Sequence, residues 1–139
     1  MGLILDTSIL IADERGKFEM PGFLRQIASV QPVLAAITAA ELLHGVERAQ
    51  DAQRRARRQH HVEQILAAVS VQAFDLIVAR CHARIWAELE SRGQMIGAHD
   101  LQIAATGLAL GHEVATLNVA EFQRVFGLHV VDATPFRRT

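Results

Sequence analysis

Short apolar runs alternate with longer helical patterns along the whole sequence, and this alternation constrains the fold more than any other feature. Runs typical of strands occupy residues 2–5, 32–38, 70–74, 113–118 and 129–133. No Asn-Gly or similar hairpin signal joins two neighbouring runs. Strands that are connected only through helices run parallel, and the helices then cover both faces of the sheet. The sequence therefore predicts an α/β fold with a parallel sheet.

Helical patterns fill the intervals between these strands. Two helices are expected to begin after Thr7 and after Pro21. Further helices are expected at 39–49, 51–69, 75–93, 97–111 and 119–125. Gly111 is a natural C-terminal stop for the helix at 97–111. A length of 139 residues matches one domain with its own core, so we expect a single domain over residues 1–139.

Composition excludes several classes of protein. No apolar run approaches the roughly 20 residues of a membrane helix, and no signal-peptide pattern is present, so we expect a cytoplasmic location and no membrane contact. Cys81 is the only cysteine, which excludes an internal disulfide and a multi-cysteine zinc site, and we expect it to be a small buried residue. The net charge of −1 argues against a strongly basic, nonspecific nucleic-acid binder.

Acidic and polar residues follow the ends of several predicted strands. Because ligands of open parallel sheets bind beyond the carboxyl ends of the strands, these side chains can converge there. Asp6 follows the first strand, and we expect Glu41 and Asp100 in the first turns of their helices. Asn118 and Glu121 flank the turn after the strand that begins at Glu113.

Two interpretations of these acids are open. Thr38 and Glu41 have the spacing of a capping box, and Asn118 and Glu121 have a related one, so capping alone explains part of the pattern. Asp100, by contrast, shares a helix face with apolar residues, where an unpaired charge is costly. Converging carboxylates repel one another unless a divalent cation neutralises them, and oxygen ligands suit Mg²⁺ or Mn²⁺.

Four segments, in order, resemble the PIN-domain ribonucleases, in particular the VapC-type toxins of bacterial toxin–antitoxin pairs. They are LILDTSILI, AAITAAELLHGVERA, IGAHDLQIAATGLALGHEVATLNVAEFQRVFGL and the closing VVD. The resemblance implies a PIN-like fold and a Mg²⁺- or Mn²⁺-dependent endoribonuclease that leaves 5′-phosphate and 3′-hydroxyl ends. It also implies an RNA substrate, a cognate VapB-type antitoxin and a homodimer.

The resemblance also implies roles for individual residues. The expected catalytic and metal-binding residues are Asp6, Glu41, Asp100, Asn118 and Glu121. The expected supporting hydroxyl residues are Thr7, Ser8 and Thr116. Asn118 and Glu121 both match the family's fourth polar position, and which of them completes the site stays open.

Two other interpretations of the sequence are open. A catalytically inactive PIN-like binding module would have the same motifs. A receiver-like Mg²⁺-binding phosphotransfer domain needs a lysine near the last strands, whereas Lys17, the only lysine, comes early. The densest basic cluster is a candidate for contacts with the RNA backbone, and it consists of Arg54, Arg55, Arg57 and Arg58.

Overall fold

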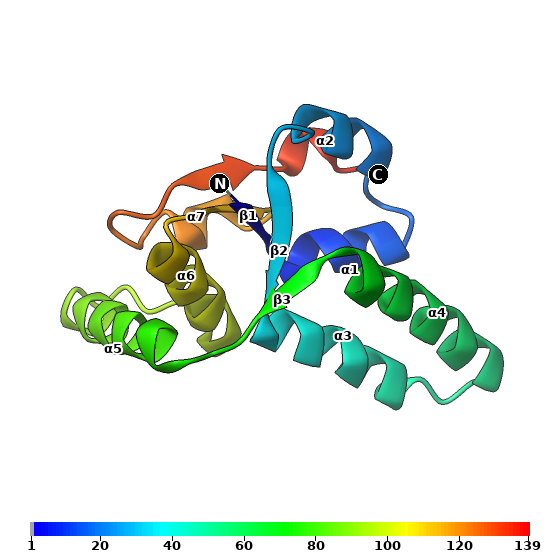
Figure 1. Cartoon of the computed structure of the whole chain (residues 1–139), viewed down its shortest axis with the longest axis horizontal. Coiled ribbons are helices and arrows are strands. Elements are labelled where there is room, and N and C mark those ends of the chain that lie inside the picture. The colour runs from blue at the N-terminus through cyan, green and yellow to red at the C-terminus, as the bar shows by residue number, and fades with distance from the viewer. Residues whose placement is uncertain (1) are drawn as a thin grey trace.

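The computed structural model describes residues 2–139 and contains a five-stranded sheet in the order β3-β2-β1-β4-β5. The strands are β1 Gly2–Leu5, β2 Gln31–Ala35, β3 Ser70–Gln72, β4 Glu113–Thr116 and β5 Val130–Asp132. All four neighbouring pairs are parallel. The predicted parallel α/β fold is therefore confirmed, and β1 lies at the centre of the sheet (Figure 1).

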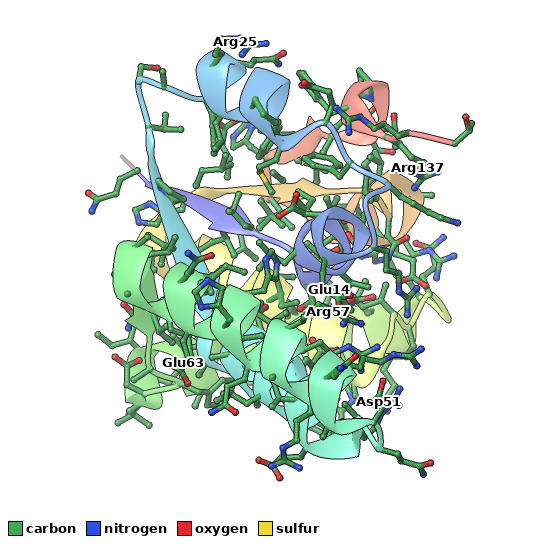
Figure 2. All side chains as sticks on the ribbon, turned by 90° about the vertical axis from the view of Figure 1, so that its right-hand side faces the viewer. Glu14, Arg25, Asp51, Arg57, Glu63 and Arg137 are labelled. Carbon is green, nitrogen blue, oxygen red and sulfur yellow. The ribbon has the colours of Figure 1, made fainter. Side chains whose placement is uncertain are left out.

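Helices provide every connection between consecutive strands. They are α1 Thr7–Glu14, α2 Met20–Gln26, α3 Ala36–Arg48, α4 Ala52–Ala68, α5 Leu76–Ser91, α6 Ala98–Leu110 and α7 Val119–Phe122, followed by a 3-10 turn at Thr134–Phe136. Helix α6 ends as predicted at Gly111, which has a left-handed φ of 69°. Figure 2 shows α4 across the front of the molecule, with Arg57 and Glu63 labelled on it.

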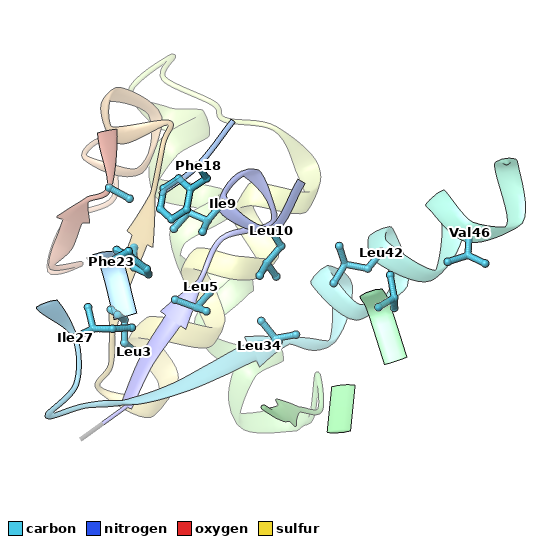
Figure 3. Packing of buried hydrophobic residues seen from close by; sticks show 13 residues of the cluster. Leu3, Leu5, Ile9, Leu10, Phe18, Phe23, Ile27, Leu34, Leu42 and Val46 are labelled. Atoms are coloured by element: carbon cyan, nitrogen blue, oxygen red, sulfur yellow. The ribbon is translucent and has the colours of Figure 1, made fainter. Parts of the chain in front are cut away.

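The two faces of the sheet carry separate apolar cores because strand side chains alternate in direction. Leu3 and Leu5 of β1 pack with side chains of α1, α2, α3 and α4 (Figure 3). Ile4, between them, packs on the other face with side chains of α5, α6 and α7. With helices on both faces, the polar edges at the strand ends are the places where a site can open to solvent.

Several predicted boundaries differ from the structure by a few residues, and one of these differences affects the site. The run 32–38 was expected to be a strand, but β2 ends at Ala35 and α3 begins at Ala36. An apolar run with several alanines suits a buried helix start as well as a strand, so the pattern does not mark the boundary. Glu41 consequently lies in the second turn of α3 rather than the first. The capping-box interpretation of Thr38 and Glu41 is also wrong, because the N-cap position is Ala35.

The C-terminal tail returns to the connection between α1 and α2. Phe18 forms an isolated antiparallel bridge with Arg137, and the amide of Arg138 donates to the Lys17 carbonyl at 2.8 Å. The rings of Phe18, Phe23 and Phe136 pack against one another below this contact. The last residues of the chain are thereby fixed beside the end of α1 (Figure 1).

Two expectations from composition can be compared with the structure. Within residues 2–139, no helix has the length and apolar character needed to cross a membrane. Cys81 is buried in α5, as predicted for a small apolar side chain.

Candidate active site

Asp6 lies at the centre of the site, directly after β1 and at the N-cap position of α1. It is only 1% exposed. Its Oδ2 accepts hydrogen bonds from Ser8 Oγ at 2.6 Å and from Thr116 Oγ1 at 2.7 Å. Burial raises the pKa of Asp6 above its usual value, and these hydroxyl groups act in the opposite direction. Two hydroxyl residues that the sequence singled out therefore hold this carboxylate in place.

Glu41 reaches the same region from α3. Its Oε1 accepts a hydrogen bond from the Thr7 hydroxyl at 2.8 Å, and Thr7 lies 3.0 Å from the buried hydroxyl of Thr38. Its Oε2 lies 3.2 Å from Nδ1 of His99 on α6. The sequence pattern did not identify His99 as a partner, because this contact depends on how α3 and α6 pack.

Asp100 occupies the first turn of α6, as predicted, and is half-buried. Its pKa is raised to about 7, chiefly by burial and then by a side-chain hydrogen bond with Glu121. The negative charges of Asp6, Glu121 and Glu41 raise it further. Four of the five predicted acidic or amide side chains thus act on one another at the carboxyl edge of the sheet.

Asn118 and Glu121 differ in what they contact. Asn118 occupies the N-cap position of α7, but its side chain makes no capping hydrogen bond, and it is exposed. Its backbone amide donates to Thr116 Oγ1 at 2.8 Å. Glu121 is the residue that hydrogen-bonds with Asp100. Capping therefore does not account for either the Thr38–Glu41 pattern or the Asn118–Glu121 pattern.

The donor set of this cluster fits a hard divalent cation. Every side chain in it offers carboxylate oxygens, which are the ligands that Mg²⁺ and Mn²⁺ prefer. Burial and then the neighbouring carboxylates make ionisation of Asp100 unfavourable, as its raised pKa indicates, and a cation would offset this negative charge. Over residues 2–139, the side chains as placed form no cage in which three His, Cys, Asp or Glu residues could hold a metal ion. Closing the carboxylates around a cation therefore requires side-chain movement.

A cleft of about 230 Å³ adjoins Glu41 between α1, α3 and α4. Its apolar wall includes Leu10, Leu42 and Val62, while Glu41 and His99 belong to its polar wall. The acidic cluster is thus continuous with a groove that is apolar on one side.

The arginine cluster on α4 is partly occupied by contacts within the protein. Arg58 donates to Glu14 Oε1 at 3.1 Å and to the Gly45 carbonyl at 3.0 Å, and Arg55 pairs with Glu47 at 3.1 Å. The two other arginines, Arg54 and Arg57, are exposed. Half of the cluster therefore holds α4 against α1 and α3.

An acidic cluster at the carboxyl edge of a parallel sheet defines a class of metal-binding α/β proteins, and a family comparison identifies the class. Residues 3–127 match the model of the PIN domain family. The chain belongs to the PIN domain family. Its similarity to individual proteins of known name narrows the comparison to one group of that family.

The relatives are VapC ribonucleases. The chain is 36% identical over 131 residues to Ribonuclease VapC1 of Rickettsia felis, covering 94% of this chain and 96% of the relative. Among solved structures, DNA-bound VapBC from Salmonella typhimurium has a TM-score of 0.85 at 26% identity, covering 95% of this chain and 98% of that one. VapBC-5 of Mycobacterium tuberculosis, a member of the VapBC family of toxin–antitoxin systems, has a TM-score of 0.72 at 26% identity, with coverages of 94% and 97%.

Proposed function

We propose that this protein is a Mg²⁺- or Mn²⁺-dependent endoribonuclease and the toxin of a type II toxin–antitoxin pair, acting in the cytoplasm. Its single domain extends over residues 1–139. The observation that carries the proposal is the convergence of Asp6, Glu41, Asp100 and Glu121, with the pKa of Asp100 raised to about 7. PIN-domain ribonucleases generally depend on divalent metal, and the ribonuclease relatives support an RNA substrate.

The proposed roles follow from the contacts of each side chain. Asp6, Asp100, Glu41 and Glu121 would hold the cation, with the exposed amide of Asn118 as a further oxygen donor at the rim. Bound metal would activate water for attack on the phosphodiester and offset negative charge on the phosphate and leaving oxygen.

The hydroxyl groups of Ser8, Thr116 and Thr7 hold two of these carboxylates in place. Ser8 and Thr116 both donate to Asp6, and Thr7 donates to Glu41. Hydrogen bonds of this kind favour the charged form of a carboxylate against the effect of burial.

Cleavage of the phosphodiester by metal-activated water leaves a 5′-phosphate and a 3′-hydroxyl.

Cleavage of a mixed RNA pool by the purified protein tests the proposal. We expect products with Mg²⁺ or Mn²⁺, none with EDTA, and 5′-phosphate ends that accept ligation to an adaptor. Asp6→Asn should abolish cleavage while the far-ultraviolet circular dichroism stays unchanged. Metal binding by calorimetry without any cleavage would instead favour an inactive PIN-like binding module.

The receiver-like alternative does not agree with the fold. Receiver domains have the strand order 2-1-3-4-5, whereas this sheet has the order 3-2-1-4-5. The lysine that such a site needs near the last strands is also missing from the sequence, since Lys17 is the only lysine.

We also propose a VapB-type antitoxin as protein partner and a homodimer as the assembly. The solved VapBC proteins of the same fold support an antitoxin. On the α5 side, Phe74, Leu76, Ile77 and Trp86 are exposed apolar side chains available for a protein contact. Light scattering across micromolar concentrations should give the mass of a dimer, and co-expression of the adjacent gene should suppress toxicity. A monomer at all concentrations, or toxicity unaffected by that gene, would contradict the respective proposal.

A further inference from the structure

A second basic surface adjoins the acidic site, and it shares Arg15 with the cleft that Arg58 of α4 lines. It is a hollow of about 300 Å³ whose cationic lining is Arg15, Lys17, Arg137 and Arg138 and whose lining also includes Ser8. Arg15 and Lys17 come from the connection that follows α1, and the two other arginines come from the C-terminal tail. The bridge between Phe18 and Arg137 brings these segments together, although they are more than a hundred residues apart. We call this surface the basic hollow.

The basic hollow is connected to the catalytic carboxylates by a short series of hydrogen bonds. Arg137 Nη2 donates to the carbonyl of Leu117 at 3.4 Å, and the amide of Leu117 donates to Ser8 Oγ at 3.2 Å. Ser8 Oγ donates in turn to Asp6 Oδ2 at 2.6 Å. One wall of the hollow, Ser8, is therefore a hydrogen-bond donor to the most buried acid of the site.

We propose that the RNA backbone crosses the basic hollow on its way to the acidic site, with phosphates beside Arg15, Lys17, Arg137 and Arg138. This inference rests on the proposed ribonuclease function and adds the path of the substrate to it. An acidic site repels phosphate, so attraction must come from cations next to it. The hollow places four such cations around one depression adjoining that site.

Two of the four cations at the hollow are not paired with acids of the described protein. Arg138 pairs loosely with Glu19 at 3.7 Å, and the exposed carboxylate of Asp132 is near Arg137. Among the described residues, Arg15 and Lys17 have no ion-pair partner within 4.0 Å. On α4, Arg55 and Arg58 are likewise paired, and among the described residues Arg54 and Arg57 have no ion-pair partner, so ion pairing does not distinguish the two surfaces. The hollow is preferred because its lining includes Ser8, which donates a hydrogen bond to Asp6.

The test compares two variants that remove two exposed positive charges each. Arg15→Gln/Lys17→Gln alters the hollow, and Arg54→Gln/Arg57→Gln is the matched control on α4. Both are made in an Asp100→Asn background so that RNA is bound with Mg²⁺ without being cut. Fluorescence anisotropy of a labelled single-stranded oligoribonucleotide of mixed sequence gives the affinity at several salt concentrations.

We expect the hollow variant to bind several-fold more weakly and to flatten the slope of log K against log salt by about 1.4, or about 0.7 for each lost phosphate contact. The control should match its parent. Equal flattening in both variants, flattening in the control alone, or an unchanged slope in the hollow variant would each overturn the proposal.

Two further measurements keep this result separate from the function itself. Arg137→Gln/Arg138→Gln repeats the test from the tail side, and it decides the question if the first variant does not fold. Wild-type protein is assayed in parallel for metal-dependent RNA cleavage. Absence of cleavage there contradicts the proposed function, whereas cleavage by wild type together with an unchanged salt slope in both hollow variants contradicts only the path proposed for the RNA.

Discussion

Replacing Asp100 with Asn should raise the stability of the metal-free protein while removing its activity. The substitution keeps the shape of the side chain but eliminates one negative charge from a cluster in which Asp6, Glu41 and Glu121 already repel it. The folded state at neutral pH then no longer has to hold that charge among the others. Cleavage should fall by more than about a hundredfold, because ligation of a catalytic metal is worth several kcal/mol in the transition state.

The pKa of Asp100 sets both the size and the pH window of the stability change. A rise from 3.8 to about 7 corresponds to about 4 kcal/mol at about 1.36 kcal/mol per pKa unit. Because the group is only half-buried, solvent screening reduces this to about 1–2 kcal/mol. The folded state binds the proton more tightly than the unfolded chain, so this stability is fully present below about pH 4 and is lost as the pH rises through about 7.

Thermal unfolding in EDTA at pH 4 and at pH 8 measures this effect. At pH 8 we expect Asp100→Asn to melt about 3–8 °C above wild type, and at pH 4 we expect no difference. Asp132→Asn is the matched control, since hydrogen bonds from Thr134 lower the pKa of this exposed acid, and neutralising it should give no gain at pH 8. Equal melting temperatures of wild type and Asp100→Asn at pH 8, or wild-type cleavage by the variant, would refute the reasoning.

Three smaller predictions concern the surroundings of the site. Thr116→Val removes a donor from the buried Asp6 carboxylate, so urea unfolding should show a loss of about 1–3 kcal/mol at neutral pH. Gly107→Ala should lower the free energy of unfolding by about 1–3 kcal/mol in the same assay, because a Cβ there would lie 2.8 Å from a methyl carbon of β4. His99→Ala removes the partner of Glu41, so we expect half-maximal cleavage to need a higher Mn²⁺ concentration while the melting temperature stays unchanged. That result would confirm that His99 positions Glu41.

The topology was predictable because it depends on connections rather than on exact boundaries. Five apolar runs separated by helical patterns allow only a parallel sheet, and each strand was placed within a few residues. The boundary between β2 and α3 was not predictable, since Ala35 and Ala36 continue the same apolar run and differ only in backbone conformation. The error left Glu41 at the correct edge of the sheet, because any helix that follows a parallel strand begins at the carboxyl edge.

The site was predictable where burial conflicts with charge. Asp6 follows four buried residues and Asp100 shares a face with Ile103, so each needs a physical reason to be acidic. Residues that meet the site only through tertiary packing have no comparable signal in the sequence. His99 meets Glu41 only because α6 packs on α3. The basic hollow likewise depends on the tail folding back onto α1.

The conflict between burial and charge also links the stability of this protein to its chemistry. A chain selected for metal-free stability alone would replace Asp100 with a neutral residue, because burial and then the neighbouring carboxylates oppose its ionisation. Hydroxyl donors hold Asp6 and Glu41 directly, whereas the side-chain hydrogen bond of Asp100 is to another acid, which raises its pKa instead of lowering it. Among its described residues, the protein therefore supplies hydroxyl donors to Asp6 and Glu41 but none to Asp100. Asp100 is the acid whose negative charge the metal-free protein tolerates least, so metal affinity should depend more strongly on Asp100 than on Glu41.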